Sequence, residues 1–154
     1  MTLGPRIYNL FPLLVGSVQD WSGHLARIAG MQFDWVFLNP IHYPGFSGSL
    51  YAVKDPYRLH DRFQGGASES PDDLIRGFCG RAEEHGMRVM LDLVVNHTSD
   101  RHPWFLSAAS DRDSPFRDWY VWRDEIPPGA PKDLVFPDKE NSNWEWHADT
   151  GQFY

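Results

Sequence analysis

The chain has 154 residues, and its 21 Asp and Glu outnumber its 14 Lys and Arg, which gives a formal net charge of −7. This balance argues against a nucleic-acid partner, because such a partner requires a basic face that displaces phosphate counterions. The hydrophobic share of 42% supports a buried core and is too high for a disordered chain. The single Cys79 excludes an intramolecular disulfide and is typical of a reducing compartment.

The apolar stretch nearest the start, Leu10 to Val15, is interrupted by Pro12. It is far shorter than the ~20 residues that span a bilayer, and it is also too short for a secretory signal peptide. We therefore expect a soluble, cytoplasmic protein that has no membrane partner.

The first predicted elements are a strand over residues 7–11, which Pro12 stops, and a helix that follows it. Gly30 suits the left-handed position that closes a helix. The apolar positions of this helix fall on one face at i, i+4, i+7 and i+8, namely Trp21, Leu25, Ile28 and Ala29.

A second strand over residues 35–38 is almost entirely apolar, which is typical of a strand buried on both faces of a parallel sheet. Residues 41–69 show no hydrophobic period, and a loop of this length is usually functional. A second helix begins at Ser70, with Pro71 in its first turn, and a third buried strand covers residues 89–95.

Alternating strands and helices of this kind predict a parallel α/β sheet whose strand ends meet at one edge. Three strands and two helices make a poor closed core, and a (β/α)₈ barrel takes about 250 residues. We therefore expect residues 1–97 to be the first part of a larger fold. Residues 98–154 are rich in Pro and Trp and look helical only at 102–110, so we expect them to begin an irregular subdomain.

The candidate functional residues follow the second and third strands, because ligands of parallel α/β folds bind at the carboxyl ends of strands. Asn39 follows the second strand, and Asn96 and His97 follow the third. Asp92 is expected inside the third strand, where it either satisfies nearby backbone groups or belongs to a site. His97 alone is more typical of a structural histidine, but beside Asp92 and Asn96 it favours a site.

Two further signals are weaker. The ring of Tyr51 in the long loop offers a flat apolar surface to a sugar. For a single loop tyrosine without further context, however, the favoured interpretation is that Tyr51, like Tyr57, packs the loop onto the sheet. Asn96 offers one carbonyl oxygen to Ca²⁺, which takes 6–8 oxygens. We find no zinc-protease, paired-Cys or EF-hand motif, so we expect no metal cofactor. Binding of Ca²⁺ near Asn96 is the one possibility that stays open.

The segment Asp92-Leu93-Val94-Val95-Asn96-His97 resembles the D-x-V-x-N-H signature at the third barrel strand of the α-amylase family, glycoside hydrolase family 13. The similarity covers essentially the whole chain in the same order. The other segments that resemble the family are Gly30 to Pro40, Leu50 to Tyr57, Asn143 to Trp146 and Thr150 to Tyr154.

The resemblance implies the first three strands and two helices of a TIM barrel, followed by the start of an inserted subdomain. It also implies an α-glucan or malto-oligosaccharide substrate. His97 would hydrogen-bond the sugar on the non-reducing side of the cleaved bond, Tyr51 would stack on it, and Asp92 would support the network. Asn96 matches a position that holds Ca²⁺ in some members. The Asp-rich calcium turn of some oligoglucosidases is absent at residues 14–17.

Family members are retaining enzymes with a carboxylate nucleophile and a second carboxyl group as acid and base. The resemblance assigns these groups to the fourth and fifth strands, which we do not find in these 154 residues. We therefore expect no catalytic residue in this chain, no activity of the chain alone, and a requirement for the remainder of the barrel.

The resemblance leaves the subgroup open. Residues 12–16 resemble maltosyltransferases that use maltose 1-phosphate, whereas the residues near Asp92 equally resemble trehalose synthases and oligoglucosidases, and Ala52 stands where many members have Asp. An alternative from another class is a non-catalytic carbohydrate- or partner-binding α/β module, which a cooperative melt of the isolated chain would favour. A third possibility, a flavodoxin-like binding domain, needs five strands, whereas the sequence predicts only three.

Overall fold

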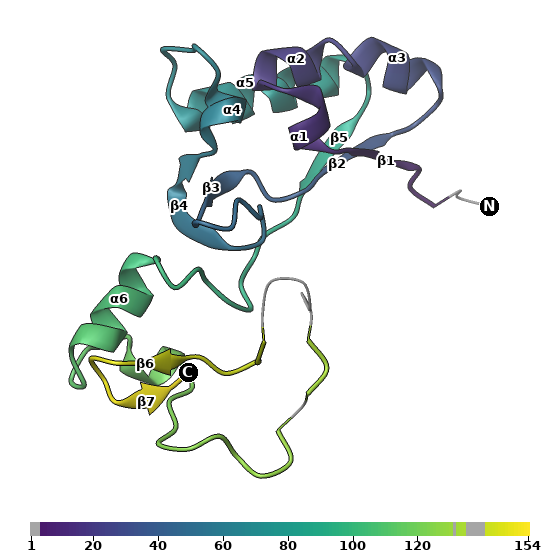
Figure 1. Ribbon diagram of the computed structural model, residues 1–154. Coiled ribbons are helices and arrows are strands. Elements are labelled where there is room, and N and C mark those ends of the chain that lie inside the picture. The colour runs from purple at the N-terminus through teal and green to yellow at the C-terminus, as the bar shows by residue number, and fades with distance from the viewer. Residues whose placement is uncertain (1–3, 131, 135–140) are drawn as a thin grey trace. The chain divides into compact units, whose positions relative to one another are not determined.

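The computed structural model describes residues 4–130, 132–134 and 141–154. The chain divides into two compact units, Met1–Ser99 and Asp100–Tyr154, and each contains its own helices and strands (Figure 1). In the described part of the chain, no helix combines the length and the apolar character that crossing a membrane requires.

A parallel sheet of three strands forms the centre of the first unit. It consists of β1 (Ile7–Leu10), β2 (Trp35–Leu38) and β5 (Arg88–Leu91), in the order β1-β2-β5. The register places Leu10, Leu38 and Leu91 level with one another. The carboxyl ends of the three strands therefore meet at one edge, as the alternation of strands and helices predicts.

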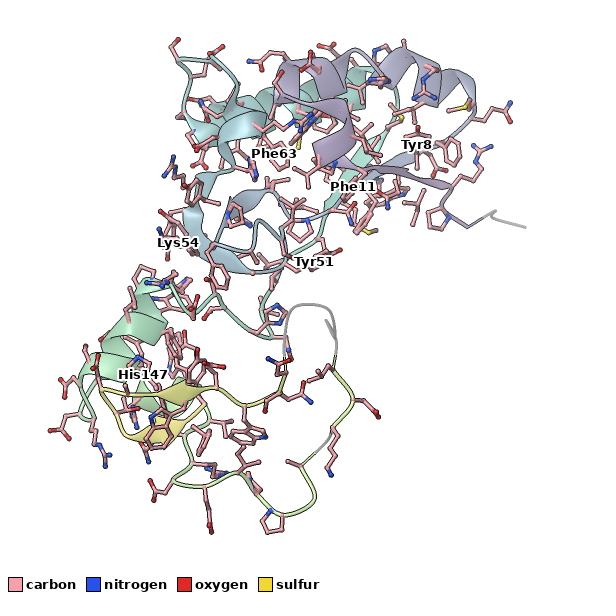
Figure 2. The ribbon with its side chains drawn as sticks, in the orientation of Figure 1. Tyr8, Phe11, Tyr51, Lys54, Phe63 and His147 are labelled. Carbon is pink, nitrogen blue, oxygen red and sulfur yellow. The ribbon has the colours of Figure 1, made fainter. Side chains whose placement is uncertain are left out.

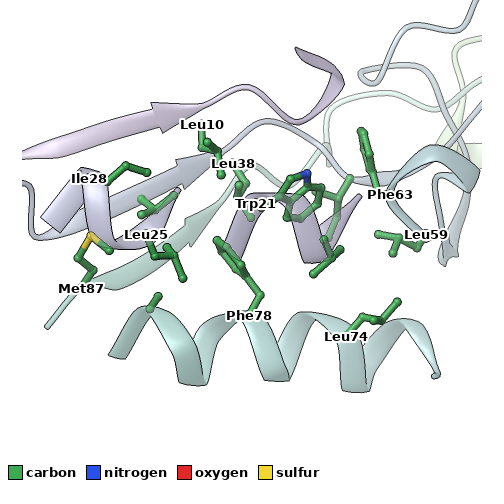
Figure 3. Close-up of a cluster of buried hydrophobic side chains, with 14 of the residues drawn as sticks. Leu10, Trp21, Leu25, Ile28, Leu38, Leu59, Phe63, Leu74, Phe78 and Met87 are labelled. Atoms are coloured by element: carbon green, nitrogen blue, oxygen red, sulfur yellow. The ribbon is translucent and has the colours of Figure 1, made fainter. Parts of the chain in front are cut away.

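The helices of this unit are α1 (Pro12–Val15), α2 (Val18–Ser22), α3 (Leu25–Gly30), α4 (Asp61–Gln64) and α5 (Pro71–Glu84). Their apolar side chains form a cluster with those of the sheet, as Figure 3 shows. Trp21 lies at the centre of this cluster, with its ring edge-on to the rings of Phe63 and Phe78 at centroid distances of 5.3 and 5.7 Å. Its indole Nε1 donates a hydrogen bond of 2.9 Å to the carbonyl of Gly16, so the one polar atom of this buried ring is satisfied.

Helix α5 begins where the sequence predicts. The Ser70 hydroxyl accepts a hydrogen bond from the backbone N–H of Asp73 and donates one to its carboxylate. Three core residues follow at i+4 spacing, namely Leu74, Phe78 and Ala82. Gly86 then takes a positive φ of 71° just beyond the helix, which is the left-handed conformation that commonly closes one.

The prediction of a single helix across residues 21–29 is wrong, because the segment forms two short helices, α2 and α3, that meet at Gly23 and His24. The predicted burial nevertheless holds across the break, since Trp21, Leu25 and Ile28 are all fully buried. Gly30 belongs to α3, and the left-handed position is taken by Gln32, with a φ of 66°.

The prediction of a long irregular loop over residues 41–69 is also wrong. The segment contains α4 and a two-stranded antiparallel sheet of β3 (His42–Pro44) and β4 (Val53–Leu59). Pro44 lies within β3 and Pro56 lies within β4. The register of the two strands shifts on both sides of Tyr43. Strands interrupted in this way do not show the regular alternation by which a sequence reveals a strand.

Strand β5 ends at Leu91, so the expectation that Asp92 lies inside a buried strand over residues 89–95 is wrong. The backbone N–H of Asp92 extends the ladder by one bond of 2.9 Å to Leu38, and pairing then stops. Leu93 and Val95, which follow the strand, are 63% and 81% exposed, and β5 is an edge strand of the described sheet.

The second unit contains α6 (Pro103–Ser110), the short 3₁₀ helix η1 (Arg117–Trp119), and the antiparallel pair β6 (Trp146–His147) and β7 (Gln152–Phe153). The helix predicted at 102–110 is thus confirmed, with the His102 ring accepting a hydrogen bond from Trp104 as its cap. Buried Phe105 contacts a ring of aromatic side chains, namely Tyr120, Trp122, His147 and Tyr154.

Arg117 connects the segments of the second unit. Its guanidinium donates hydrogen bonds to the carbonyl of Ala108 and to the side chain of Gln152, and it lies 3.9 Å from the centre of the Trp122 ring. The Trp122 indole donates in turn to the Arg117 carbonyl. One side chain therefore joins α6, η1 and β7 where little regular backbone pairing does so.

Candidate functional site

The carboxyl edge of the sheet brings Asn39 and Asp92 to adjacent positions, because each follows the aligned residues Leu38 and Leu91. Asn39 is rigidly placed. It continues β2, the central strand, and it precedes the fully buried Pro40, which restricts the preceding residue to extended conformations.

Tyr51 lies in the loop between β3 and β4 (Figure 2). Backbone hydrogen bonds close this loop, from Gly45 to Ala52 at 2.8 Å and from Ala52 to Ser49 at 3.0 Å. The Asn39 amide donates a hydrogen bond of 3.0 Å to the Tyr51 hydroxyl. The side chain nevertheless remains 41% exposed, so the phenol is held at its tip while part of its ring is open to solvent.

His97 contacts the same residue from the segment that follows β5. Its Nε2 lies 2.9 Å from the backbone carbonyl of Tyr51, and its Nδ1 lies 3.4 Å from the Asn96 amide nitrogen. A carbonyl oxygen can only accept, so Nε2 must carry a proton, and Nδ1 is then free to accept from Asn96 in the neutral ring. Tyr51 is therefore held at two points, its hydroxyl and its carbonyl.

The segment after β5 continues along the hairpin beyond this contact. The backbone N–H of Ser99 donates to the carbonyl of Val53 at 2.9 Å. A Cβ atom added to Gly45 would meet the Ser99 hydroxyl at 2.2 Å and its Cβ at 3.0 Å, so any larger residue would force Ser99 to shift. Glycine at this position therefore allows the segment that follows β5 to lie close against the Tyr51 loop.

The structure thus brings together the predicted residues Tyr51, Asn96 and His97. It adds Asn39 as their partner, which sequence reasoning placed at the edge without assigning it a contact. Asp92 lies at the same edge and is half-buried, but its carboxylate forms no hydrogen bond or ion pair with the described residues. The interpretation in which Asp92 satisfies nearby backbone groups therefore has no support, and its role in a site stays a prediction.

The described residues contain no group of three or more His, Cys, Asp or Glu side chains that could hold a metal ion. Asn96 places its amide nitrogen toward His97, which leaves one amide oxygen for a cation. Ca²⁺ takes 6–8 oxygen ligands, so Asn96 alone does not make a calcium site, and calcium binding stays an open prediction.

A family model of the α-amylase catalytic domain matches residues 12–154. The chain therefore belongs to the α-amylase family. Membership of this family makes the parallel sheet of the first unit part of a (β/α)₈ barrel.

Individual relatives agree with this assignment. The chain is 36% identical to a probable alpha-glucosidase of Rhizobium meliloti over 98% of its own length and 28% of the relative. It is 32% identical to the trehalose synthase/amylase TreS of Mycobacterium tuberculosis over 88% of its length and 22% of the relative. The crystal structure of trehalose-6-phosphate hydrolase from Bacillus licheniformis superposes with a TM-score of 0.79 at 29% identity, covering 97% of this chain and 27% of that one. The chain spans about a quarter of the length of these relatives.

Proposed function

We propose that this chain supplies the sugar-holding part of the active site of an enzyme that hydrolyses or transfers α-linked glucosyl units. The observation that carries the proposal is the double anchoring of Tyr51, by Asn39 and by His97, at the carboxyl edge of an α-amylase-family sheet. Ligands of barrel enzymes bind at this edge, and a fixed, partly exposed aromatic ring is a suitable surface for the C–H face of a sugar.

The three predicted site residues have distinct roles in this proposal. Tyr51 stacks on the glucosyl ring, His97 hydrogen-bonds one of its hydroxyls, and Asp92 supports the network from the strand edge. The Nε2 of His97 already donates to the Tyr51 carbonyl, so a sugar hydroxyl that bonds this nitrogen must share it with that carbonyl or displace it. No residue of this chain is proposed as nucleophile or as acid and base.

The reaction itself depends on carboxylates that the family places on the fourth and fifth barrel strands. One carboxylate attacks the anomeric carbon, and the resulting covalent glucosyl intermediate passes to water or to a second sugar. Hydrolysis and transfer differ only in this acceptor. The proposed substrate class is therefore an α-glucan, a malto-oligosaccharide or a related α-glucoside, and the remainder of the barrel is required for turnover.

The test is an assay of the complete gene product on maltose, isomaltose, trehalose and maltose 1-phosphate. We expect turnover of at least one of them, and proton NMR should show the first product in the α configuration, because a retaining mechanism preserves it. We expect no turnover by residues 1–154 alone. Absence of both turnover and binding for every sugar would contradict the proposal and favour a binding module with another ligand.

Membership of the barrel family also gives the two units separate proposed identities. Residues 1–97 would be the first part of the catalytic barrel, and residues 98–154 would begin its inserted subdomain. A cytoplasmic location is a further prediction, based on the single Cys79. Fractionation of cells that express the complete gene product tests it directly.

A further inference from the structure

The amide of Asn39 forms the one side-chain contact that reaches the Tyr51 hydroxyl among the described residues. We propose that Asn39 is a positioning residue that sets the plane of the Tyr51 ring, and with it the surface on which the sugar lies. The inference rests on the proposed sugar-stacking function of Tyr51. It extends that function to Asn39, a residue that would not itself contact the sugar.

Asn39 is well suited to orient the Tyr51 ring, because its backbone is held in the sheet independently of the hydrogen bond to Tyr51. It continues the central strand of the sheet, between the fully buried Leu38 and Pro40. A side chain that starts from such a position loses little further freedom when it forms a hydrogen bond. Tyr51, in contrast, belongs to a hairpin loop, and its ring can rotate about its side-chain bonds unless its tip is held.

The two anchors of Tyr51 have different effects. His97 holds the backbone carbonyl of Tyr51 and so fixes where the ring begins. Asn39 holds the hydroxyl at the opposite end and so fixes the direction in which the ring points. The contact with the hydroxyl survives either orientation of the Asn39 amide, because a phenol both donates and accepts hydrogen bonds.

The other amide atom supports a functional origin for this arrangement. Oδ1 of Asn39 is buried and has no hydrogen-bond partner among the described residues. An unpaired buried acceptor is unfavourable, and an apolar side chain of similar size would avoid that cost. Among the described residues, an amide at this position therefore stabilises the fold less than an apolar side chain would, which favours a role in the site over a role in the fold.

The test is a double-mutant cycle in the complete gene product, using Asn39→Leu, Tyr51→Phe and the double variant. The probe is 1-deoxynojirimycin, an iminosugar with the glucose configuration, because its binding needs no particular glycosidic linkage. Tyr51→Phe retains the stacking ring and removes only the hydroxyl. Gln19→Ala, at an exposed position of α2, is the control that leaves affinity unchanged.

We expect Asn39→Leu to weaken binding of the iminosugar about fivefold, the effect of one net hydrogen bond, and to weaken it no further in the Tyr51→Phe background. Its melting temperature should not fall, because the variant also removes the unpaired acceptor. With a substrate that the enzyme turns over, KM should rise while kcat changes little, since the ring contacts the sugar before and during reaction.

The possible failures are distinguishable. If Asn39→Leu weakens binding equally with and without the Tyr51 hydroxyl, the positioning role is overturned while the proposed function stands. If Asn39→Leu lowers the melting temperature without any loss of affinity, the positioning role is also overturned, because Asn39 then has only a structural role. If the unsubstituted protein binds neither the iminosugar nor any of the α-linked sugars, the proposed function itself is contradicted.

Discussion

The two units of this chain are stabilised in different ways. In the first unit, aliphatic and aromatic side chains pack between a parallel sheet and its helices, and backbone hydrogen bonds supply the framework. In the second, short elements are joined by an aromatic cluster around Phe105 and by the hydrogen bonds of one arginine, Arg117. The candidate site belongs to the first unit, where regular elements can fix side chains most precisely.

The largest effect should come from the core of the first unit. Leu25→Ala removes a fully buried side chain, so we expect a loss of about 2–5 kcal/mol in the free energy of unfolding. Leu14→Ala is the matched control, because the same substitution at a position that is 82% exposed should change stability by less than about 0.5 kcal/mol. Urea titration followed by helical circular dichroism measures both. Equal effects would mean that the first unit is not held by this core.

The next effect tests the second unit. Arg117→Met keeps an extended apolar side chain but removes the hydrogen bonds to Ala108 and Gln152, so we expect a loss of about 1.5–3 kcal/mol. Arg76→Met is the control, because Arg76 is exposed on α5 and forms no hydrogen bond or ion pair with the described residues. The second unit holds most of the seven tryptophans, so tryptophan fluorescence reports mainly on its unfolding.

A smaller effect is expected at the start of α5. Ser70→Ala removes the hydroxyl that accepts from the Asp73 N–H, which should cost about 1 kcal/mol. Ser68→Ala is exposed, lies outside the helix and should be neutral. If Ser70→Ala lowers the urea midpoint of the helical signal and leaves that of tryptophan fluorescence unchanged, the two units unfold independently. A loss in both signals would show that the two units unfold together.

The smallest effect concerns pH. Burial lowers the pKa of His42 and of His60 from the usual value of 6.5, although Asp55 and Asp61 act in the opposite direction. The folded protein therefore binds protons at these rings less readily than the unfolded chain. Stability should be fully present above about pH 6.5 and should fall as the pH drops through that value. Urea midpoints between pH 7.5 and 5.5 measure this, and the double variant His42→Gln/His60→Gln should reduce the slope.

Much of the first unit could be predicted from the sequence because its signals are local. The apolar run before Asn39 and the cap at Ser70 each depend on a few adjacent residues, and both elements occur where expected. The hairpin of β3 and β4 could not be predicted in this way. Its strands are interrupted by prolines, its register is irregular, and one of its strands is held by a contact distant in sequence, from Ser99 to Val53.

The residues of the candidate site could be predicted from the sequence, but the hydrogen bonds between them could not. Tyr51, Asn96 and His97 stand in a segment pattern that resembles a known family, and the family model bears out that resemblance. The hydrogen bond between Asn39 and Tyr51 depends on the path of the chain through a loop that has no sequence period. The exposure of Leu93 and Val95 likewise depends on which segments pack against the chain after β5, and no local pattern reveals that.

The central claim is that the anchored ring of Tyr51 holds an α-linked glucosyl unit. The most direct measurement is kcat/KM of the complete gene product on the two anomers of p-nitrophenyl glucoside, with and without Tyr51→Ala. Our account predicts turnover of the α anomer only, and a fall of about tenfold or more in the variant as the stacking surface is lost. Turnover of the β anomer, or an α-glucosidase activity that Tyr51→Ala leaves unchanged, would contradict it.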